Sequence, residues 1–351
     1  MDLHYFLRLQ EKIKLKVAMF MSHLIKKDIL EESPLKENVL VDILLSTYNG
    51  SKYLQKLMNS IINQTYQNWR LLIRDDGSTD GTINIIHNFV KQFPTKIIYI
   101  EDQYNNLGPS QSFSKLIEYS NANYIMFCDQ DDIWLNNKIE LILEKMLQLE
   151  KEFQNKPLLV HTDLTVVDKD LQVISNSFWK YQKLNPAYKN LNHLLIQNIA
   201  TGCTMMMNKR LKELAHPIPD KAIMHDWWIA LVASIYSGIY HINASTILYR
   251  QHGENNTGAK KYSLHYFLSR SGKANESMKR IIQQGEQLSI RYKDQLNKDQ
   301  FKLVESFITL FHKNRFARLM DIFVYRFRKH GFLRNVGLII TVFFLRCKSD
   351  E

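Results

Sequence analysis

The strongest constraint on the fold is an alternation of apolar and amphipathic segments between residues 40 and 135. Four apolar segments have the length and content of buried strands: VLVDILLSTYNG (39–50), the start of WRLLIRDDGSTDGT (69–82), KIIYIEDQ (96–103) and ANYIMFCDQDD (122–132). The segments between them, Tyr53–Gln64, Ile83–Phe93 and Ser110–Ser120, have the apolar spacing of helices. This alternation predicts an α/β fold with a Rossmann-like, mostly parallel sheet flanked by helices.

Polar clusters follow each of the four predicted strands. They are Thr47-Tyr48-Asn49, Asp75-Asp76-Gly77-Ser78, Asn105-Asn106-Leu107-Gly108 and Asp129-Gln130-Asp131-Asp132. Any one of them fits an ordinary turn or helix cap. In a parallel sheet, however, the carboxyl ends of the strands meet at one edge, where ligands bind. Four clusters at consecutive strand ends therefore favour a binding site.

The segment FCDQDDIW (127–134) places three aspartates within four positions. Like charges this close repel one another, so the cluster needs a counter-charge. Carboxylate oxygens suit Mg²⁺ or Mn²⁺, and magnesium usually completes its shell with substrate phosphates. The sequence contains no GxxxxGK[ST] loop and no GxGxxG after the first strand, which disfavours a P-loop NTPase and a dinucleotide-binding dehydrogenase. The pattern indicates a metal that bridges a nucleoside diphosphate.

Cysteine content and hydropathy bear on the compartment. Cys128, Cys203 and Cys347 are widely spaced and odd in number, which disfavours a disulfide framework and favours the reducing cytoplasm. The longest apolar run, Val336–Leu345, has about half of the roughly 20 residues that a membrane-spanning helix needs. The segment Val17–Ile25 lacks a small-residue cleavage pattern, so no signal peptide is expected.

The net charge of +11 is concentrated near the C-terminus. Between His312 and Arg334, seven Lys or Arg residues stand against the single Asp321 and alternate with apolar residues. Such a basic amphipathic segment suits the anionic inner face of the cell membrane. A solvated basic face packed on the domain is the alternative. A nucleic acid is not the expected partner, because no DNA- or RNA-binding motif appears.

The domain organisation follows from changes in composition and apolar spacing along the chain. Residues 1–38 have helical apolar spacing, many lysines and a Glu-Glu-Ser-Pro ending, and are predicted to form a helical extension. A catalytic domain is expected over 39–255 and a helical, basic C-terminal region over 256–351.

The motifs STYNG, DDGSTDGT, NNLG and the DxD of FCDQDDIW, in this order, resemble the family 2 glycosyltransferases of the GT-A fold. TGCTMMMN (201–208), MHDWW (224–228) and LYRQHGENNTGA (248–259) resemble the branch of bacterial rhamnosyltransferases. The resemblance covers residues 40–255. It implies inverting transfer of a sugar from a nucleoside diphosphate donor to a hydroxyl of a glycan or lipid-linked acceptor, in the synthesis of surface polysaccharides.

The resemblance also implies roles for individual residues. Asp75 and Asp76 would contact the base and ribose of the donor, and Thr47 and Tyr48 would line the nucleotide pocket. Asp129 and Asp131 would hold the metal on the diphosphate, and Asp226 would act as the general base. His252 would contact the diphosphate or the metal, and Trp227 and Gly202 would face the acceptor.

Several alternatives stay open at this level. Asp226 also suits the cap of a helix from Trp227 to Tyr236, Asp132 suits either the metal or a helix cap, and Trp227 suits the core. His252 also suits an ordinary surface loop. The branch resemblance favours dTDP-L-rhamnose as donor, with a UDP-hexose as the alternative. A non-catalytic nucleotide-sugar-binding scaffold is the competing class.

Overall fold

The computed structural model describes residues 39–252 and 274–344. The predicted helical extension over 1–38 and the glycine- and asparagine-containing loop after His252 lie outside the described residues. From Leu40 onward the chain belongs to one compact unit. The predicted division of this unit after residue 255 stays a prediction.

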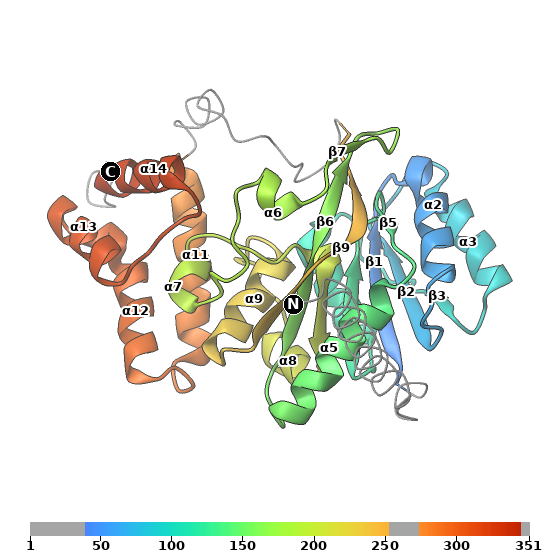
Figure 1. The fold of residues 1–351 in the computed structure, drawn as a ribbon, viewed down its shortest axis with the longest axis horizontal. Helices are drawn as coiled ribbons and strands as arrows, with labels where there is room; N and C mark the ends of the chain where they lie inside the picture. The colour runs from blue at the N-terminus through green and yellow to red at the C-terminus, as the bar shows by residue number, and fades with distance from the viewer. Residues whose placement is uncertain (1–38, 253–273, 345–351) are drawn as a thin grey trace, which may run out of the picture. The chain divides into compact units, whose positions relative to one another are not determined.

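A single mixed sheet organises the fold (Figure 1). Within the described residues its strand order is β3-β2-β1-β4-β8-β6-β9-β5, and β7 pairs with β6. The strands are β1 (Val41–Thr47), β2 (Trp69–Asp75), β3 (Ile97–Tyr99), β4 (Tyr124–Cys128), β5 (Ile133–Trp134), β6 (Leu159–Val167), β7 (Val173–Ser175), β8 (Met205–Asn208) and β9 (Ile239–Arg250).

The N-terminal half of the sheet confirms the predicted βαβ alternation. Strands β3, β2, β1 and β4 are parallel, and they are connected by α2 (Ser51–Ile62), α3 (Thr82–Gln92) and α4 (Gly108–Tyr119). Each helix begins and ends within about two residues of its prediction, because the apolar spacing marks the face that packs on the sheet. Strand β1 is buried along nearly its whole length, as expected for the centre of a parallel sheet.

The second half of the sheet adds antiparallel pairs. Strand β8 runs antiparallel to both β4 and β6, while β9 runs parallel to β6 and antiparallel to the short β5. The helices of this half are α5 (Lys138–Glu152), the single-turn α6 (Phe178–Tyr181) and α7 (Leu191–Leu194), η1 (Gly202–Thr204), α8 (Lys209–Ala215) and α9 (His225–Ile235).

The strand register brings the polar clusters to one edge. Thr47 at the end of β1 pairs with Asp75 at the end of β2, and Leu45 pairs with Cys128 at the end of β4. Because the three strands are parallel and in step, the loops that follow them emerge at the same level. The predicted functional edge of the sheet therefore forms through backbone register alone.

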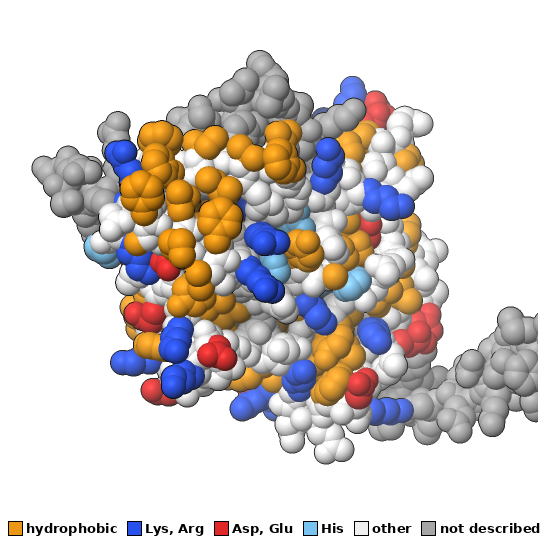
Figure 2. Space-filling view, turned by 60° about the vertical axis from the view of Figure 1, so that its left-hand side comes forward, with side chains coloured by type: hydrophobic (Ala, Val, Ile, Leu, Met, Phe, Trp, Pro, Cys, Tyr) orange, Lys and Arg blue, Asp and Glu red, His pale blue; other side chains and the backbone are white. Residues whose placement is uncertain are grey.

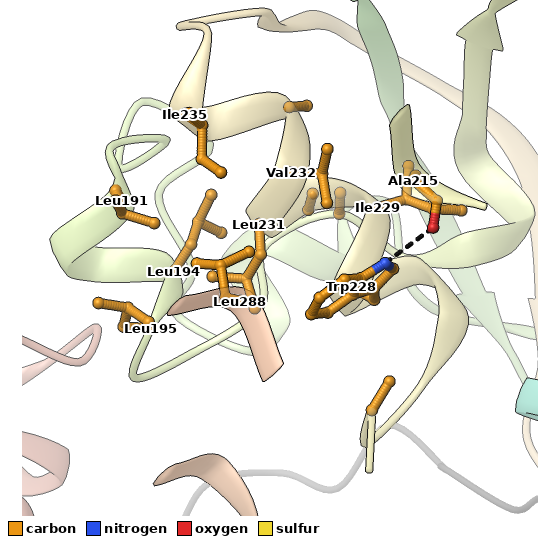
Figure 3. Packing of buried hydrophobic residues seen from close by; sticks show 14 of the residues in the cluster. Leu191, Leu194, Leu195, Ala215, Trp228, Ile229, Leu231, Val232, Ile235 and Leu288 are labelled. Atoms are coloured by element: carbon orange, nitrogen blue, oxygen red, sulfur yellow. Dashed lines mark hydrogen bonds between the residues drawn. The ribbon is translucent and has the colours of Figure 1, made fainter. Parts of the chain in front are cut away.

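Helix α9 lies at the centre of the hydrophobic core. Trp228 is fully buried among leucines of neighbouring elements, and its indole nitrogen donates to the Ala215 carbonyl at 2.9 Å (Figure 3). Leu288 reaches the same cluster from α11 (Ala274–Tyr292). The C-terminal helices thus share the core of the sheet domain.

The C-terminal region contains α11, α12 (Lys298–Ile308), η3 (Thr309–His312), α13 (Arg315–Val324) and α14 (Phe332–Phe343). Asn297 caps α12 with a full capping box formed with Gln300, and the side chain of Asn314 caps α13. Over the described ranges 39–252 and 274–344, no helix combines the length and apolarity needed to cross a bilayer.

Candidate active site

A cavity of about 1180 Å³ opens at the carboxyl ends of the parallel strands. All four predicted polar clusters contribute to its lining. Among the predicted site residues, the lining includes Thr47, Tyr48, Asp76, Asp129, Asp131, Gly202, Asp226, Trp227 and His252. Asp75 is buried and does not line the cavity. The fold thus gathers nearly all of the predicted residues around one space.

Asp75 is held entirely by protein donors. Its Oδ1 accepts from the hydroxyls of Thr47 at 2.7 Å and Ser78 at 2.6 Å. Its Oδ2 accepts from the backbone N–H groups of Gly77 at 3.1 Å and Ser78 at 2.7 Å. Gly77 has a φ of +95°, which favours glycine and turns the loop back over the carboxylate. Asp75 therefore shapes the loop after β2, and its donor contact stays a prediction.

Asp76 joins the second and third polar clusters. Its Oδ1 accepts from Arg74 Nη1 at 2.8 Å and from the Leu107 N–H at 2.9 Å, and its Oδ2 accepts from the Gly108 N–H at 2.8 Å. The fully buried Arg74 also bridges to Asp102, with Nε donating to Oδ2 at 2.8 Å. A buried cation with two carboxylate partners is satisfied in both charge and hydrogen bonds. The Arg74–Asp76 ion pair, with the Leu107 and Gly108 N–H groups bonded to Asp76, fixes the loop before α4.

The aspartates after β4 are crowded and short of donors. Burial raises the pKa of Asp129 to about 7, and the charges of Asp131 and Asp226 add to the rise. Burial also holds the pKa of Asp132 well above its ordinary value, again with help from its two neighbours in the motif. Carboxylates in this state take up either protons or a cation. The cluster is thus electrostatically prepared for a positive ligand.

The donor set fits a hard divalent cation. Ligand atoms of Asp129, Asp132 and Cys203 lie within 4.8 Å of one another, and within the described ranges Oδ2 of Asp132 has no hydrogen-bond partner. Burial raises the pKa of the Cys203 thiol well above its usual value, so the thiol stays protonated and the oxygen atoms are the better ligands. The α5 helix is capped at Asn137, so the interpretation of Asp132 as its cap is wrong.

The end of β9 positions the acidic loop. His252 Nε2 lies 2.7 Å from Asp131 Oδ2, and its ring lies 4.8 Å from the ring of Tyr53. The Arg250 Nε donates to the Asp131 carbonyl at 3.0 Å, and its guanidinium stacks over the same tyrosine at 4.8 Å. His252 therefore belongs to the site, as one sequence interpretation proposed, and is not an isolated surface residue.

A buried lysine stands behind the acidic cluster. Lys138, the first residue of α5, donates from Nζ to the Cys203 carbonyl at 2.7 Å and lies 4.4 Å over the ring of Trp134. Burial lowers its pKa to about 8, so it remains mostly charged at neutral pH. Its charge lowers the pKa of Asp129. Lys138 therefore offsets part of the negative charge of the cluster.

Asp226 faces the cavity from the first turn of α9. The cap of this helix is Met224, so the capping interpretation of Asp226 is wrong. Oδ2 of Asp226 accepts from the Gly202 N–H at 3.0 Å, and Oδ1 accepts from the N–H of the following residue. Burial raises its pKa to about 6, against the lowering effect of these backbone donors. A carboxylate poised near neutrality suits a general base.

Gly202 is required by the close approach of two elements. A Cβ built on it would lie 2.9 Å from Nε2 of the buried His225 and 3.4 Å from Cβ of Asp226. Burial lowers the pKa of His225 to about 3, so this ring is neutral, and it packs against Phe113 with centroids 4.1 Å apart. The glycine lets the 202 backbone donate directly to the Asp226 carboxylate.

The opposite end of the cavity is lined by an aromatic ring and amides. Trp227 is half-buried, lines the cavity and donates from Nε1 to the Leu194 carbonyl at 2.6 Å. Its neighbour Trp228 is a core residue, as the alternative for these tryptophans held. Gln182, Gln197 and Asn198 also line this end. These amide side chains offer both hydrogen-bond donors and acceptors to the cavity.

Several site residues carry no sequence signal that local reasoning detects. The Gln130 amide binds both backbone groups of Tyr48, accepting at 2.9 Å and donating at 2.9 Å. Arg250 and the 182–198 segment lie far from the aspartates in sequence, and Lys138, although only six residues after Asp132, carries no pattern that marks it as part of the site. Of these residues, only Gln130 lies within the acidic motif, where its position could have marked it as a site residue. The rest needed the tertiary fold.

The sheet, its flanking helices and the acidic edge define the GT-A fold, which confirms the predicted fold class. A crystal structure of S. aureus TarS, residues 1–349, has a TM-score of 0.50 at 15% identity and covers 87% of this chain and 80% of that one. The sequence model of Glycosyl transferase family 2 matches residues 42–214. Residues 42–214 of this chain therefore form a glycosyl transferase family 2 domain.

Two relatives describe the breadth of the similarity. The dTDP-rhamnosyl transferase RfbG of Shigella flexneri is 27% identical over 234 residues, or 61% of this chain and 74% of RfbG. The UDP-Glc:alpha-D-GlcNAc-diphosphoundecaprenol beta-1,3-glucosyltransferase WfgD of Escherichia coli is 25% identical over 193 residues. This match covers 54% of this chain and 69% of WfgD. Matches to two other curated glycosyltransferases span only 42% and 43% of their lengths.

Proposed function

We propose that this protein is an inverting glycosyltransferase that moves a sugar from a nucleoside diphosphate to an acceptor hydroxyl. The observation that carries the proposal is the convergence of the acidic cluster after β4 and Asp226 on one cavity. The crowded carboxylates favour a bound cation, and Asp226, which lines the same cavity, has a pKa of about 6. The family 2 domain supports the same class of reaction.

In this proposal the chain supplies one general base and a negatively charged binding site for a cation. The acceptor oxygen bonds to the anomeric carbon while the bond from that carbon to the diphosphate breaks, and the electron pair stays on the diphosphate. Asp226 takes the proton of the acceptor hydroxyl late in this step. The Gly202 N–H holds the carboxylate in place at 3.0 Å. Attack opposite to the leaving group inverts the anomeric centre.

The acidic cluster would hold Mg²⁺ or Mn²⁺ through Asp129 and Asp131. The ligand atoms that lie within 4.8 Å of one another belong to Asp129, Asp132 and Cys203, while Asp131 contacts His252. Such a cation neutralises negative charge that builds on a leaving diphosphate. Tyr48 and Thr47 would line the nucleotide pocket, and Asp76 would orient the loop that closes it.

The donor we favour is dTDP-L-rhamnose. The similarity to the dTDP-rhamnosyl transferase RfbG supports it. A UDP-hexose is the second candidate, supported by the similarity to WfgD. The acceptor would be a glycan or lipid-linked intermediate of a bacterial surface polysaccharide. The enzyme would then act in the cytoplasm, peripherally at the inner face of the cell membrane through its C-terminal region.

Release of the nucleoside diphosphate tests the proposal directly. Full-length protein is incubated with a panel of dTDP-, UDP- and GDP-sugars, with and without Mn²⁺ or Mg²⁺. We expect cation-dependent release that is fastest with dTDP-L-rhamnose. Turnover of a UDP-hexose alone would replace the favoured donor and keep the enzyme class.

A non-catalytic scaffold predicts a different result. It would bind a nucleotide sugar by calorimetry without releasing diphosphate, and Asp226→Asn would bind as tightly as the unchanged protein. We expect instead that Asp226→Asn keeps donor binding and loses turnover by about 10² to 10⁴. Equal turnover in both proteins would contradict the role of Asp226.

A further inference from the structure

Helices α13 and α14 expose large apolar side chains together. Phe332 and Phe316 are 81% and 77% exposed, the highest values among the large apolar residues of the described ranges. The other exposed apolar residues of this region are Met320, Phe323, Val324, Leu333, Ile340 and Phe344. Hydrophobic side chains gather on the face that carries these helices, with Lys and Arg side chains beside them (Figure 2). We call these eight residues the apolar surface.

Each of the two helices has one packed face and one open apolar face. In α13, Arg318 and Ile322 are buried, whereas Phe316, Met320 and Phe323 follow the i, i+4, i+7 spacing of a different stripe. In α14, Gly337, Leu338 and Val342 are among the buried residues, whereas Phe332, Ile340 and Phe344 are exposed. A helix that is apolar on all sides normally has partners on all sides. The open stripes therefore indicate a second apolar environment.

The charges of this region lie differently from the simple basic face that the sequence suggested. Arg318 and Arg334 are buried and donate to backbone carbonyls, and Lys313 pairs with Asp321 at 2.5 Å. The exposed cations are Arg315, Arg326 and Arg328. Asp321 is the single acidic residue between 312 and 344 and is already paired. Between residues 312 and 344, the exposed charged side chains are therefore all positive.

The apolar surface connects directly to the acceptor end of the cavity. The His330 N–H, in the turn between α13 and α14, donates to Gln197 Oε1 at 3.0 Å. Arg334, in the first turn of α14, donates to Gln182 Oε1 at 3.4 Å. Gln182 and Gln197 both line the cavity. Residues of α14 and of the turn before it are therefore hydrogen-bonded directly to the glutamines that would face the acceptor, so a partner bound to α13 and α14 would lie close to them.

We propose that the apolar surface inserts into the interface of an anionic phospholipid bilayer. Its phenylalanines would enter the boundary between headgroups and acyl chains, and Arg315, Arg326 and Arg328 would contact lipid phosphates. Hydrophobic insertion holds the protein, and the cations select the anionic lipid. This deepens the membrane contact of the proposed function and places a lipid-linked acceptor beside Gln182 and Gln197.

Charge favours a bilayer over a second copy of the chain. In a two-fold dimer through this surface, the arginines of both copies would border the same interface with no acidic residue available between 312 and 344 to pair them. An anionic bilayer offers apolar depth and negative charge together, and each exposed cation near it adds about fivefold in affinity. Both properties of the surface are then matched by one partner.

Vesicle flotation of the full-length protein tests the inference. We expect the protein to float with vesicles of phosphatidylcholine and phosphatidylglycerol, and less with phosphatidylcholine alone. The triple variant Phe316→Ser, Phe323→Ser, Phe332→Ser should lower the bound fraction by about tenfold or more. Ile290→Ser is the matched control, since Ile290 is 76% exposed on α11, away from the apolar surface. It should bind like the unchanged protein.

A second variant separates the two contributions. Arg315→Gln, Arg326→Gln, Arg328→Gln should keep binding to neutral vesicles and lose the preference for phosphatidylglycerol. Thermal unfolding and donor binding of each variant check that the fold is intact. The flotation assay requires no turnover, so a failed proposed function would leave this result standing.

Three outcomes would overturn the inference. The first is that the unchanged protein remains in the dense fraction with both vesicle types. The second is that the triple phenylalanine variant floats as well as the Ile290→Ser control. The third is that light scattering shows a dimer that the phenylalanine variant dissociates while flotation is unchanged, in which case a second copy covers the surface.

Discussion

Two aspartate clusters at the same edge of the sheet behave in opposite ways. Asp75 and Asp76, after β2, accept hydrogen bonds on every carboxylate oxygen from hydroxyls, backbone N–H groups and Arg74. Asp129 and Asp132, after β4, are crowded by like charge, and their pKa values are raised by burial. The first cluster is completed by the protein. In the proposed function, the second is completed by a bound cation.

The comparison shows how to distinguish structural from ligand-binding acids. Both clusters follow buried strands, both contain adjacent aspartates, and both fit turn sequences equally well. The number of protein donors around each carboxylate separates them. A buried carboxylate with full hydrogen bonding shapes a loop, whereas one without it keeps a capacity for cations.

The largest expected effect is on the under-satisfied cluster. Asp131→Asn should lower diphosphate release by about a thousandfold, because the cation seat loses a charge that the leaving group depends on. Steady-state assays across a Mn²⁺ titration measure it. Asp170→Asn, the same change in an exposed turn, is the control and should leave turnover unchanged. Equal loss in both variants would break the comparison.

Removing a partner from the fully hydrogen-bonded cluster after β2 should lower the stability of the protein. Arg74→Leu leaves Asp76 and Asp102 without their buried partner, and the free energy of unfolding should fall by about 3–5 kcal/mol. Arg70→Leu is the matched change at an ion pair whose arginine is 21% exposed and whose buried partner Asp42 keeps bonds from Ser120 and Ala122. It should cost less, about 1.5 kcal/mol. Denaturant unfolding measures both, and similar losses would contradict the special role of Arg74.

A divalent cation should stabilise the protein more at high pH. Asp129 and Asp226 have folded-state pKa values of about 7 and 6, above their unfolded values. Between about pH 4 and 7 the folded state therefore binds more protons than the unfolded state, so the free energy of unfolding falls as pH rises. Mn²⁺ offsets this loss. At about 100 times Kd it should add about 2.7 kcal/mol.

Thermal unfolding with and without Mn²⁺, at about pH 5.5 and about pH 8, measures this difference. The increase in Tm should be larger at the higher pH and should nearly vanish in Asp131→Asn. A Tm increase that is independent of pH would indicate that the cation binds away from the acidic cluster.

The smallest expected effect is a fall in kcat/KM at low pH. Asp226 acts as a base only when ionised, so kcat/KM should fall about tenfold per pH unit below its pKa of about 6. A pH profile at saturating Mn²⁺ measures it, and the residual activity of Asp226→Asn should lack that limb. A flat profile of the unchanged protein between about pH 5 and 7 would assign the proton to another group.

Much of the fold was predictable because it depends on local periodicity. The helices α2, α3 and α4 and the strands between them follow from apolar spacing, and the shared edge follows from parallel pairing. Nearly all of the predicted site residues line one cavity, because motif order specifies which loops meet, and their roles stay predictions. The exceptions are instructive: Asp75 is buried behind its own loop, and Asp226 and Asp132 cap no helix.

The sequence by itself determined the class of fold and the identity of the acids, because hydrophobic period and charge are properties of neighbouring residues. Only the tertiary structure decided which acids keep an unmet need for a cation, since the donors around Asp76 and Asp132 come from Leu107, Gly108 and Arg250. It also decided that α13 and α14 leave apolar stripes open. Burial and hydrogen bonding are relations between distant segments, and a linear pattern does not contain them.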